Sequence, residues 1–123
     1  MGVVLAGCEA TGDTGGTRTY SSADVPLTFE VPTTFTREDV DEGNSRGDVV
    51  VAYGQSKIDV IALRRFDGEL PSGPQRHEVL GKAVTSELHR VADGYALECQ
   101  YTEDRADDVR EACEDAVASV EER

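Results

Sequence analysis

The chain has 123 residues, among them 25 Asp or Glu and 12 Lys or Arg, and its formal net charge at neutral pH is −13. This charge argues against nucleic acid as a partner, because proteins bring Lys and Arg to the phosphates, and against adsorption on anionic lipid through a basic patch. No apolar run approaches the roughly 18 residues of a transmembrane helix, and we expect one small domain.

The chain begins with a short apolar segment that ends in Leu5-Ala6-Gly7-Cys8. This string resembles a bacterial lipobox, in which small residues precede the cleaved bond and a cysteine thiol accepts the lipid. The resemblance implies that Cys8 becomes a lipid-modified N-terminus with several acyl chains, such as palmitate, which anchor more stably than one chain. A full signal peptide has a basic segment and about 7 to 15 apolar residues before the cleavage site. We therefore interpret residues 1–8 as the remnant of a lipoprotein signal peptide; a chain that truly starts at Met1 would stay in the cytoplasm.

Residues 9–24 are rich in Gly, Ser, Thr and Asp and have no apolar periodicity. This composition predicts a flexible linker. We expect residues 25–123 to form a single α+β domain.

Three stretches have the pattern of β-strands. Val25–Val31 alternates apolar and polar residues, as a half-buried strand does, and Pro32 ends it. Val49–Tyr53 and Ile58–Leu63 are continuous β-forming runs joined by a short turn, which predicts an antiparallel hairpin. Both faces of this hairpin are apolar, so we expect cover on both sides, by helices or by a helix and a second sheet. Gly94–Tyr101 alternates again and predicts a further strand.

Two stretches have apolar residues at helical spacing. Arg76–Val91 carries one apolar stripe, although Gly81 and β-branched residues weaken it as a helix. Asp104–Glu122 has a cleaner stripe, with acidic residues in its first turn that suit the helix dipole. The predicted fold is an antiparallel β-sheet of about four to six strands packed against two helices, with the C-terminal helix last.

Two cysteines fall in adjacent predicted elements. Cys99 lies on the large-residue face of the last strand, and Cys113 lies in the apolar stripe of the helix that follows. Both sulfurs should therefore face the same strand-to-helix interface. In an oxidising compartment we expect a Cys99–Cys113 disulfide that stabilises the chain by roughly 3 kcal/mol; in the cytosol we expect two buried thiols.

No motif points to catalysis, a cofactor or a metal. Asp39–Asn44 superficially resembles the start of a calcium loop, but the glycine is one position early and Val50 stands where the bidentate Glu belongs. His77 and His89 are twelve residues apart on the weaker predicted helix with no Cys pair nearby, which argues against zinc. We therefore expect no catalytic, cofactor-binding or metal residues, with Cys8 as the lipidation site and Cys99 and Cys113 as the disulfide.

The order of elements resembles the small PsbP-like α/β domain of many bacterial envelope lipoproteins. The resemblance rests on a strand that enters Val31-Pro32-Thr33-Thr34-Phe35, on the hairpin, and on a terminal helix that ends ACEDAVASVEE. Composition is also typical of high-GC, actinobacterial-type proteins, with Arg far above Lys. The resemblance implies a protein without catalytic machinery that binds partners or small ligands at the envelope.

These observations predict a lipoprotein on the outer face of the cell membrane that acts as a non-catalytic binding or interaction module. Its partner would be an envelope protein or a small ligand, neither of which the sequence identifies. One alternative is a cytosolic acidic immunity or inhibitor protein that neutralises a basic partner. A second is a small-ligand-binding or hydrolytic enzyme, which would need a pocket with convergent polar groups.

Overall fold

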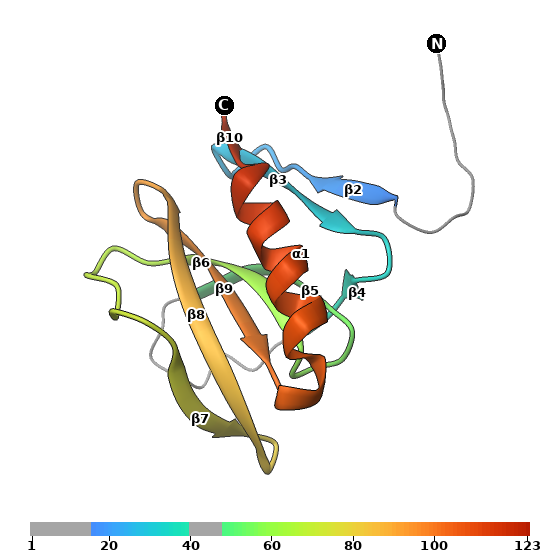
Figure 1. Cartoon of the computed structure of the whole chain (residues 1–123). Coiled ribbons are helices and arrows are strands. Elements are labelled where there is room, and N and C mark those ends of the chain that lie inside the picture. Colours follow the sequence, from blue (N-terminus) through green and yellow to red (C-terminus); the bar gives the residue numbers. More distant parts are fainter. Residues whose placement is uncertain (1–15, 40–47) are drawn as a thin grey trace.

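Nine strands form two antiparallel sheets within residues 16–39 and 48–123, the part of the chain that this computed structural model describes. The larger sheet has the order β4-β5-β6-β9-β8-β7, and the smaller sheet has the order β10-β3-β2. Figure 1 shows α1 lying across the larger sheet, with the smaller sheet beside the end of the helix. The elements are β2 (Thr17–Tyr20), β3 (Leu27–Pro32), β4 (Thr36–Arg37), β5 (Asp48–Gly54), β6 (Val60–Arg65), β7 (Gln75–Val79), β8 (Lys82–Ala92), β9 (Tyr95–Tyr101), the 3-10 turn η1 (Glu103–Arg105), α1 (Ala106–Ala118) and β10 (Glu121–Glu122).

The hydrophobic core lies between α1, β3 and one face of the larger sheet. Leu27, Phe29 and Val31 alternate with polar residues along β3 and are buried, as the period of a half-buried strand requires. They meet Leu63 and Leu97 from the larger sheet, which are fully buried. The hairpin expected from the two apolar runs is present as the antiparallel pair of β5 and β6.

The predicted helix over Arg76–Val91 is wrong, because this segment forms the hairpin of β7 and β8. Val79 pairs with Lys82, so the turn consists of Leu80 and Gly81 alone. Both turn residues have positive φ, at 53° and 79°, as the type I′ turn of a two-residue hairpin requires. The glycine that weakened the helix is therefore a turn residue.

The predicted fold class is corrected accordingly. The described residues are mostly β, with nine strands in sheets of three and six and a single short α-helix near the C-terminus. Four to six strands against two helices do not describe this arrangement. The segment predicted as a linker also contributes a strand, since Thr17–Tyr20 form β2 and pair with β3.

The C-terminal helix is shorter than its apolar pattern, and the chain continues into another strand. Ser119 ends the helix: its backbone N–H donates to the Asp115 carbonyl, and its hydroxyl accepts from the backbone N–H of Glu30 in β3 at 2.8 Å. Glu121 and Glu122 then pair with β3 as β10. The end of α1 is thus joined to the smaller sheet.

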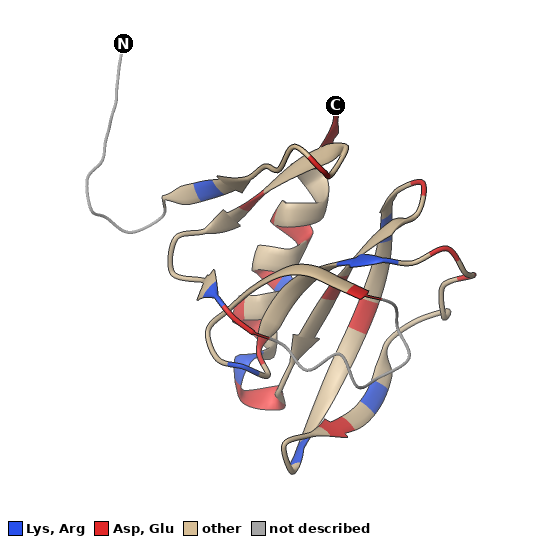
Figure 2. Cartoon of the chain, turned by 180° about the vertical axis from the view of Figure 1, so that it is seen from behind, with Lys and Arg blue, Asp and Glu red and all other residues tan. Residues whose placement is uncertain are grey.

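The other face of the larger sheet carries buried polar side chains. Figure 2 views the molecule from behind, with strands of this sheet passing in front of α1. Arg64 on β6 and Glu98 on β9 are both almost fully buried there. Among the residues the structure describes, no helix is long and apolar enough to span a membrane.

Candidate functional site

Cys99 and Cys113 join β9 to α1. Their Cα atoms are 6.1 Å apart, within the usual range for a disulfide, and the structure bonds the two sulfurs. Both residues are buried, with 1% and 3% of their surfaces exposed. The strand alternation and the helical stripe thus bring the two cysteines to one interface. Cys8, the predicted lipidation site, lies outside the described residues, as does most of the calcium-like loop Asp39–Asn44.

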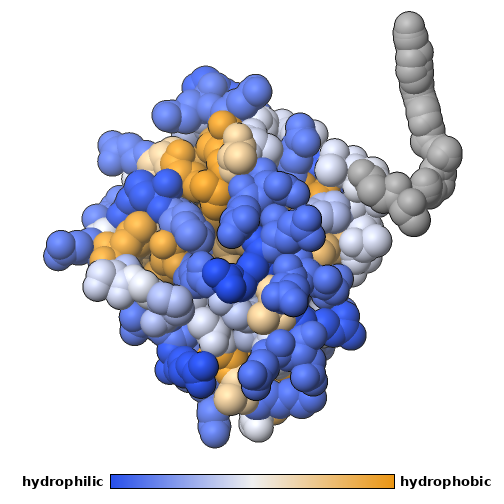
Figure 3. All heavy atoms as spheres, in the orientation of Figure 1, coloured by the Kyte–Doolittle hydropathy of each residue, from blue (hydrophilic) through white to orange (hydrophobic). Residues whose placement is uncertain are grey.

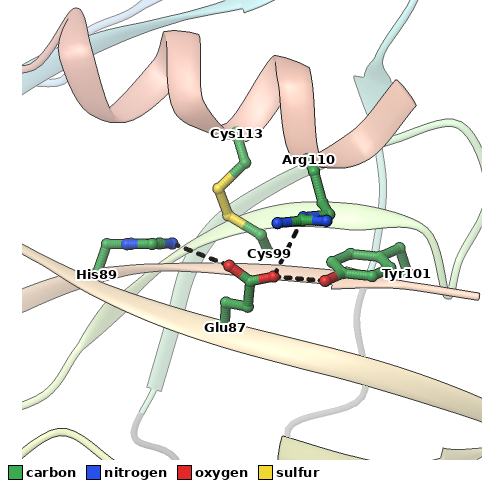
Figure 4. The surroundings of a disulfide bond; sticks show 6 residues. All are labelled: Glu87, His89, Cys99, Tyr101, Arg110 and Cys113. Carbon is green, nitrogen blue, oxygen red and sulfur yellow. Dashed lines mark hydrogen bonds and ion pairs between the residues drawn. A yellow bond between two sulfur atoms is a disulfide. The ribbon is translucent and has the colours of Figure 1, made fainter. Parts of the chain in front are cut away.

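A carboxylate lies beside this sulfur pair. Glu87 on β8 is directly opposite Cys99 on β9, and His89 follows two residues later on the same face of the strand. Arg110 is three residues before Cys113, so both side chains leave α1 on neighbouring positions of the helix surface. Figure 4 shows these side chains converging on Glu87 around the disulfide.

The two oxygens of Glu87 have different neighbours. Tyr101 donates its hydroxyl proton to Glu87 Oε2, and Arg110 Nε lies 3.6 Å from the same oxygen. His89 Nε2 lies 3.7 Å from the other oxygen, Oε1. One oxygen is therefore held by Tyr101 and Arg110, while the other faces His89.

Burial and Glu87 together change the acidity of Tyr101. Burial, the hydrogen bond to Glu87 and the negative charge of Glu87, in decreasing order of effect, together raise the pKa of the Tyr101 phenol to about 12. The positive charge of Arg110 lowers this pKa, but its effect is smaller. Tyr101 therefore stays a proton donor to Glu87 throughout the neutral range.

The cluster also places three possible metal ligands together. The side-chain ligand atoms of His89, Cys99 and Cys113 all lie within 4.8 Å of one another. Along the sequence neither histidine has a cysteine pair nearby, but the pairing of β8 with β9 brings His89 next to Cys99 and Cys113. If Arg76–Val91 is interpreted as a strand, Glu87 and His89 lie on the same face of it. Pairing that strand with Gly94–Tyr101 then brings this face to the side of the sheet that carries Cys99.

A second polar cluster lies on the opposite face of the larger sheet. Arg64 Nε is 2.7 Å from Glu98 Oε1, with both side chains 1% exposed. Nearby, His77 Nε2 lies 2.7 Å from the hydroxyl of Ser86, which in turn is hydrogen-bonded to Gln100. Nothing in the sequence pattern of Ile58–Leu63 predicted that the strand would continue into a buried arginine.

The Ser86–His77 contact superficially resembles a nucleophile with its base. Ser86 is fully buried, however, so its hydroxyl has no access to a substrate. A second serine, Ser56, donates to Asp59, while Asp59 accepts from the backbone and hydroxyl of Thr102. Asp59 thus ties Ser56 to Thr102, the residue that precedes η1, and stabilises the local fold.

No protein-family profile and no curated protein matches the chain. A similar solved structure is the solution structure of cyanobacterial PsbP (CyanoP) from Synechocystis sp. PCC 6803, which is 15% identical, with a TM-score of 0.47. The match covers 91% of this chain and 98% of that one.

Proposed function

We propose that this chain is a lipid-anchored binding module on the outer face of the cell membrane, held there through Cys8. The observation that supports the proposal most is the Cys99–Cys113 pair at bonding distance between β9 and α1. Disulfides persist in oxidising compartments and are rare in the cytosol. A buried disulfide therefore favours export, and the string Leu5–Cys8 supplies a route for anchoring an exported chain.

The charge of the protein is consistent with a covalent anchor. A net charge of −13 repels an anionic membrane, so the lipid on Cys8 would have to hold the protein at the bilayer. On the face drawn in Figure 3, hydrophilic residues cover most of the surface and hydrophobic ones form small, separate patches. That face lacks the extended apolar area that membrane-binding surfaces expose.

The first experiment tests the anchor. The gene, with the coding sequence upstream of Met1, is expressed in a lipoprotein-processing host supplied with a clickable palmitate analogue. The protein should carry the label and sediment with membranes. Cys8→Ala should lose both properties, whereas Cys113→Ala should keep both, because its thiol is not the lipid acceptor. An unlabelled wild-type protein, or an upstream sequence without a basic and apolar stretch, would overturn the anchor.

The second experiment tests the compartment. Cells are lysed directly in acid, which stops thiol exchange. The denatured protein is then alkylated without reduction by a maleimide that adds a large mass, so that burial does not shield a free thiol. An exported protein should react at neither Cys99 nor Cys113. Reaction at both residues, together with an unlabelled Cys8, would instead favour the cytosolic alternative, an acidic inhibitor of a basic partner.

One structural feature favours that alternative. Five exposed positions of α1 are acidic, and Figure 2 shows red segments along this helix. A basic protein surface would complement these charges. These residues are Asp107, Asp108, Glu111, Glu114 and Asp115.

A further inference from the structure

We propose that the reduced form of this protein binds one zinc ion through the Cys99 and Cys113 thiolates and the His89 imidazole, with Glu87 completing or orienting the site. The same residues would then have two alternative states, a disulfide and a metal centre. This inference does not depend on the lipid anchor or on the compartment in which the chain resides.

The positions of the three ligand residues suit zinc. Their ligand atoms lie within 4.8 Å of one another, and ligands of a tetrahedral zinc ion lie about 2.0–2.3 Å from the metal, hence about 3.3–3.8 Å apart. Side-chain rotations can supply this difference, since the sulfurs are free to separate once their bond is broken. The residues come from β8, β9 and α1, so the metal would link the helix to the sheet as the disulfide does.

Glu87 is already oriented toward this site. Tyr101 and Arg110 both contact Oε2, which leaves Oε1 facing His89 Nε2 at 3.7 Å. Oε1 can therefore bind the metal as a fourth ligand, or accept a hydrogen bond that fixes the ring of His89. The charge of Arg110 opposes cation binding, but it is offset by the adjacent Glu87 and by the two thiolates.

A metal ion can reach the site from the side of β8. The cysteines are buried, but 40% of the His89 side chain and 21% of the Glu87 side chain are exposed. The imidazole thus lies at the surface end of the cluster and the sulfurs at its buried end.

The conversion balances with a dithiol as the reductant. The dithiol supplies two electrons and two protons, the Cys99–Cys113 bond breaks, and the dithiol becomes a disulfide. Zinc then displaces the two protons from the cysteine thiols. In the reverse step the two thiolates pass two electrons to a disulfide of the partner, which takes up two protons from solvent and becomes a dithiol, while the Cys99–Cys113 bond forms and the metal is released.

The test uses the full chain carrying Cys8→Ser, so that only the two buried cysteines can react. The reduced and oxidised proteins are titrated anaerobically with Co²⁺, followed by Zn²⁺. The reduced protein should bind one equivalent of Co²⁺ with the thiolate charge-transfer absorption and intense visible bands of a tetrahedral site, and Zn²⁺ should remove both. The oxidised protein should show neither signal.

Matched variants identify the ligands. His89→Ala should weaken binding at least tenfold and change the visible bands, and Glu87→Gln should weaken it by about tenfold. The other histidine, His77, lies on the opposite face of the larger sheet. His77→Ala should therefore leave the cobalt spectrum and the metal affinity unchanged. Equal affinities for the wild type and His89→Ala, or a reduced protein without a charge-transfer band, would overturn the proposal.

Circular dichroism accompanies each titration, because reduction removes the link between α1 and β9. If the reduced protein stays folded, its cobalt spectrum alone tests for the metal site. If the reduced protein unfolds, zinc should restore its native spectrum, since metal binding then supplies folding free energy. Failure of zinc to restore the spectrum would count against the site.

Discussion

The ionisation of Tyr101 reflects its surroundings. Its pKa is about 12 in the folded protein against an ordinary value of 10.0. Below pH 10 both the folded and the unfolded chain keep the phenol proton. The contribution of this protonated phenol to the free energy of unfolding is therefore complete there. Between pH 10 and 12 the unfolded chain loses this proton first, so the free energy of unfolding should fall as the pH rises.

Urea denaturation at a series of alkaline pH values measures this dependence in the oxidised protein. Tyr101→Phe should make the free energy of unfolding fall less steeply over the same window. Identical slopes for the variant and the wild type would show that Glu87 and burial do not protect this phenol.

Arg64 and Glu98 give a second prediction for single residues. Removing one member of a buried ion pair leaves a charge in the interior, at a typical cost of about 3–5 kcal/mol. Arg64→Met and Glu98→Gln should each lower the free energy of unfolding by about this amount in urea denaturation. Arg110→Ala removes a cation from the partly exposed contact with Glu87 and should cost less than about 1 kcal/mol. A similarly small effect of Arg64→Met would contradict a structural role for the pair.

The cysteines show which side-chain contacts can be predicted from sequence. Cys99 and Cys113 each belong to a clear local pattern, one strand and one helix, and consecutive elements of this kind usually pack together. Their meeting therefore needs no information from distant parts of the chain. Glu87 and His89 join them only through the pairing of β8 with β9. A helix over Arg76–Val91 does not predict that pairing.

The two-residue turn between β7 and β8 should determine part of the stability of this hairpin. Leu80 has φ of 53° and is 74% exposed, and a left-handed conformation costs an ordinary residue roughly 1–2 kcal/mol. Leu80→Asn creates Asn-Gly, the preferred pair for this turn, and should raise the free energy of unfolding by about 1 kcal/mol. Gly81→Ala should lower it by about 1 kcal/mol, because φ at Gly81 is 79°. Urea denaturation of the two variants should give changes of opposite sign; a change of the same sign would contradict the turn geometry.

The misassigned segment also shows why strands are harder to predict here than the helix. The apolar residues of β8 do not alternate regularly with polar ones, and most of its eleven residues are partly exposed. Val84, Leu88 and Val91 recur at spacings of four and three, which matches a helix by coincidence. In α1, by contrast, Val109, Ala112, Cys113 and Ala116 are all buried, and the helical stripe corresponds to a real packed face.

Charge determines the behaviour of the molecule as a whole. With 25 acidic and 12 basic side chains, folding brings like charges together, and this repulsion destabilises the compact state. Salt shortens the range of the repulsion from about 10 Å at 0.1 M to about 3 Å at 1 M. The thermal unfolding midpoint of the oxidised protein should therefore rise with added sodium chloride. Potassium chloride should act alike, and a midpoint that falls with either salt would show that attractive ion pairs dominate.

The position of β2 limits how far a Cys8 anchor would let the protein move. Because β2 begins at Thr17, nine peptide units separate its first residue from Cys8, and a fully extended chain of that length spans at most about 32 Å. That distance is close to the thickness of one bilayer's hydrocarbon core, about 30 Å. A protein on so short a tether would meet its partner close to the membrane surface, so a search for that partner should begin with proteins that are themselves attached to the same membrane.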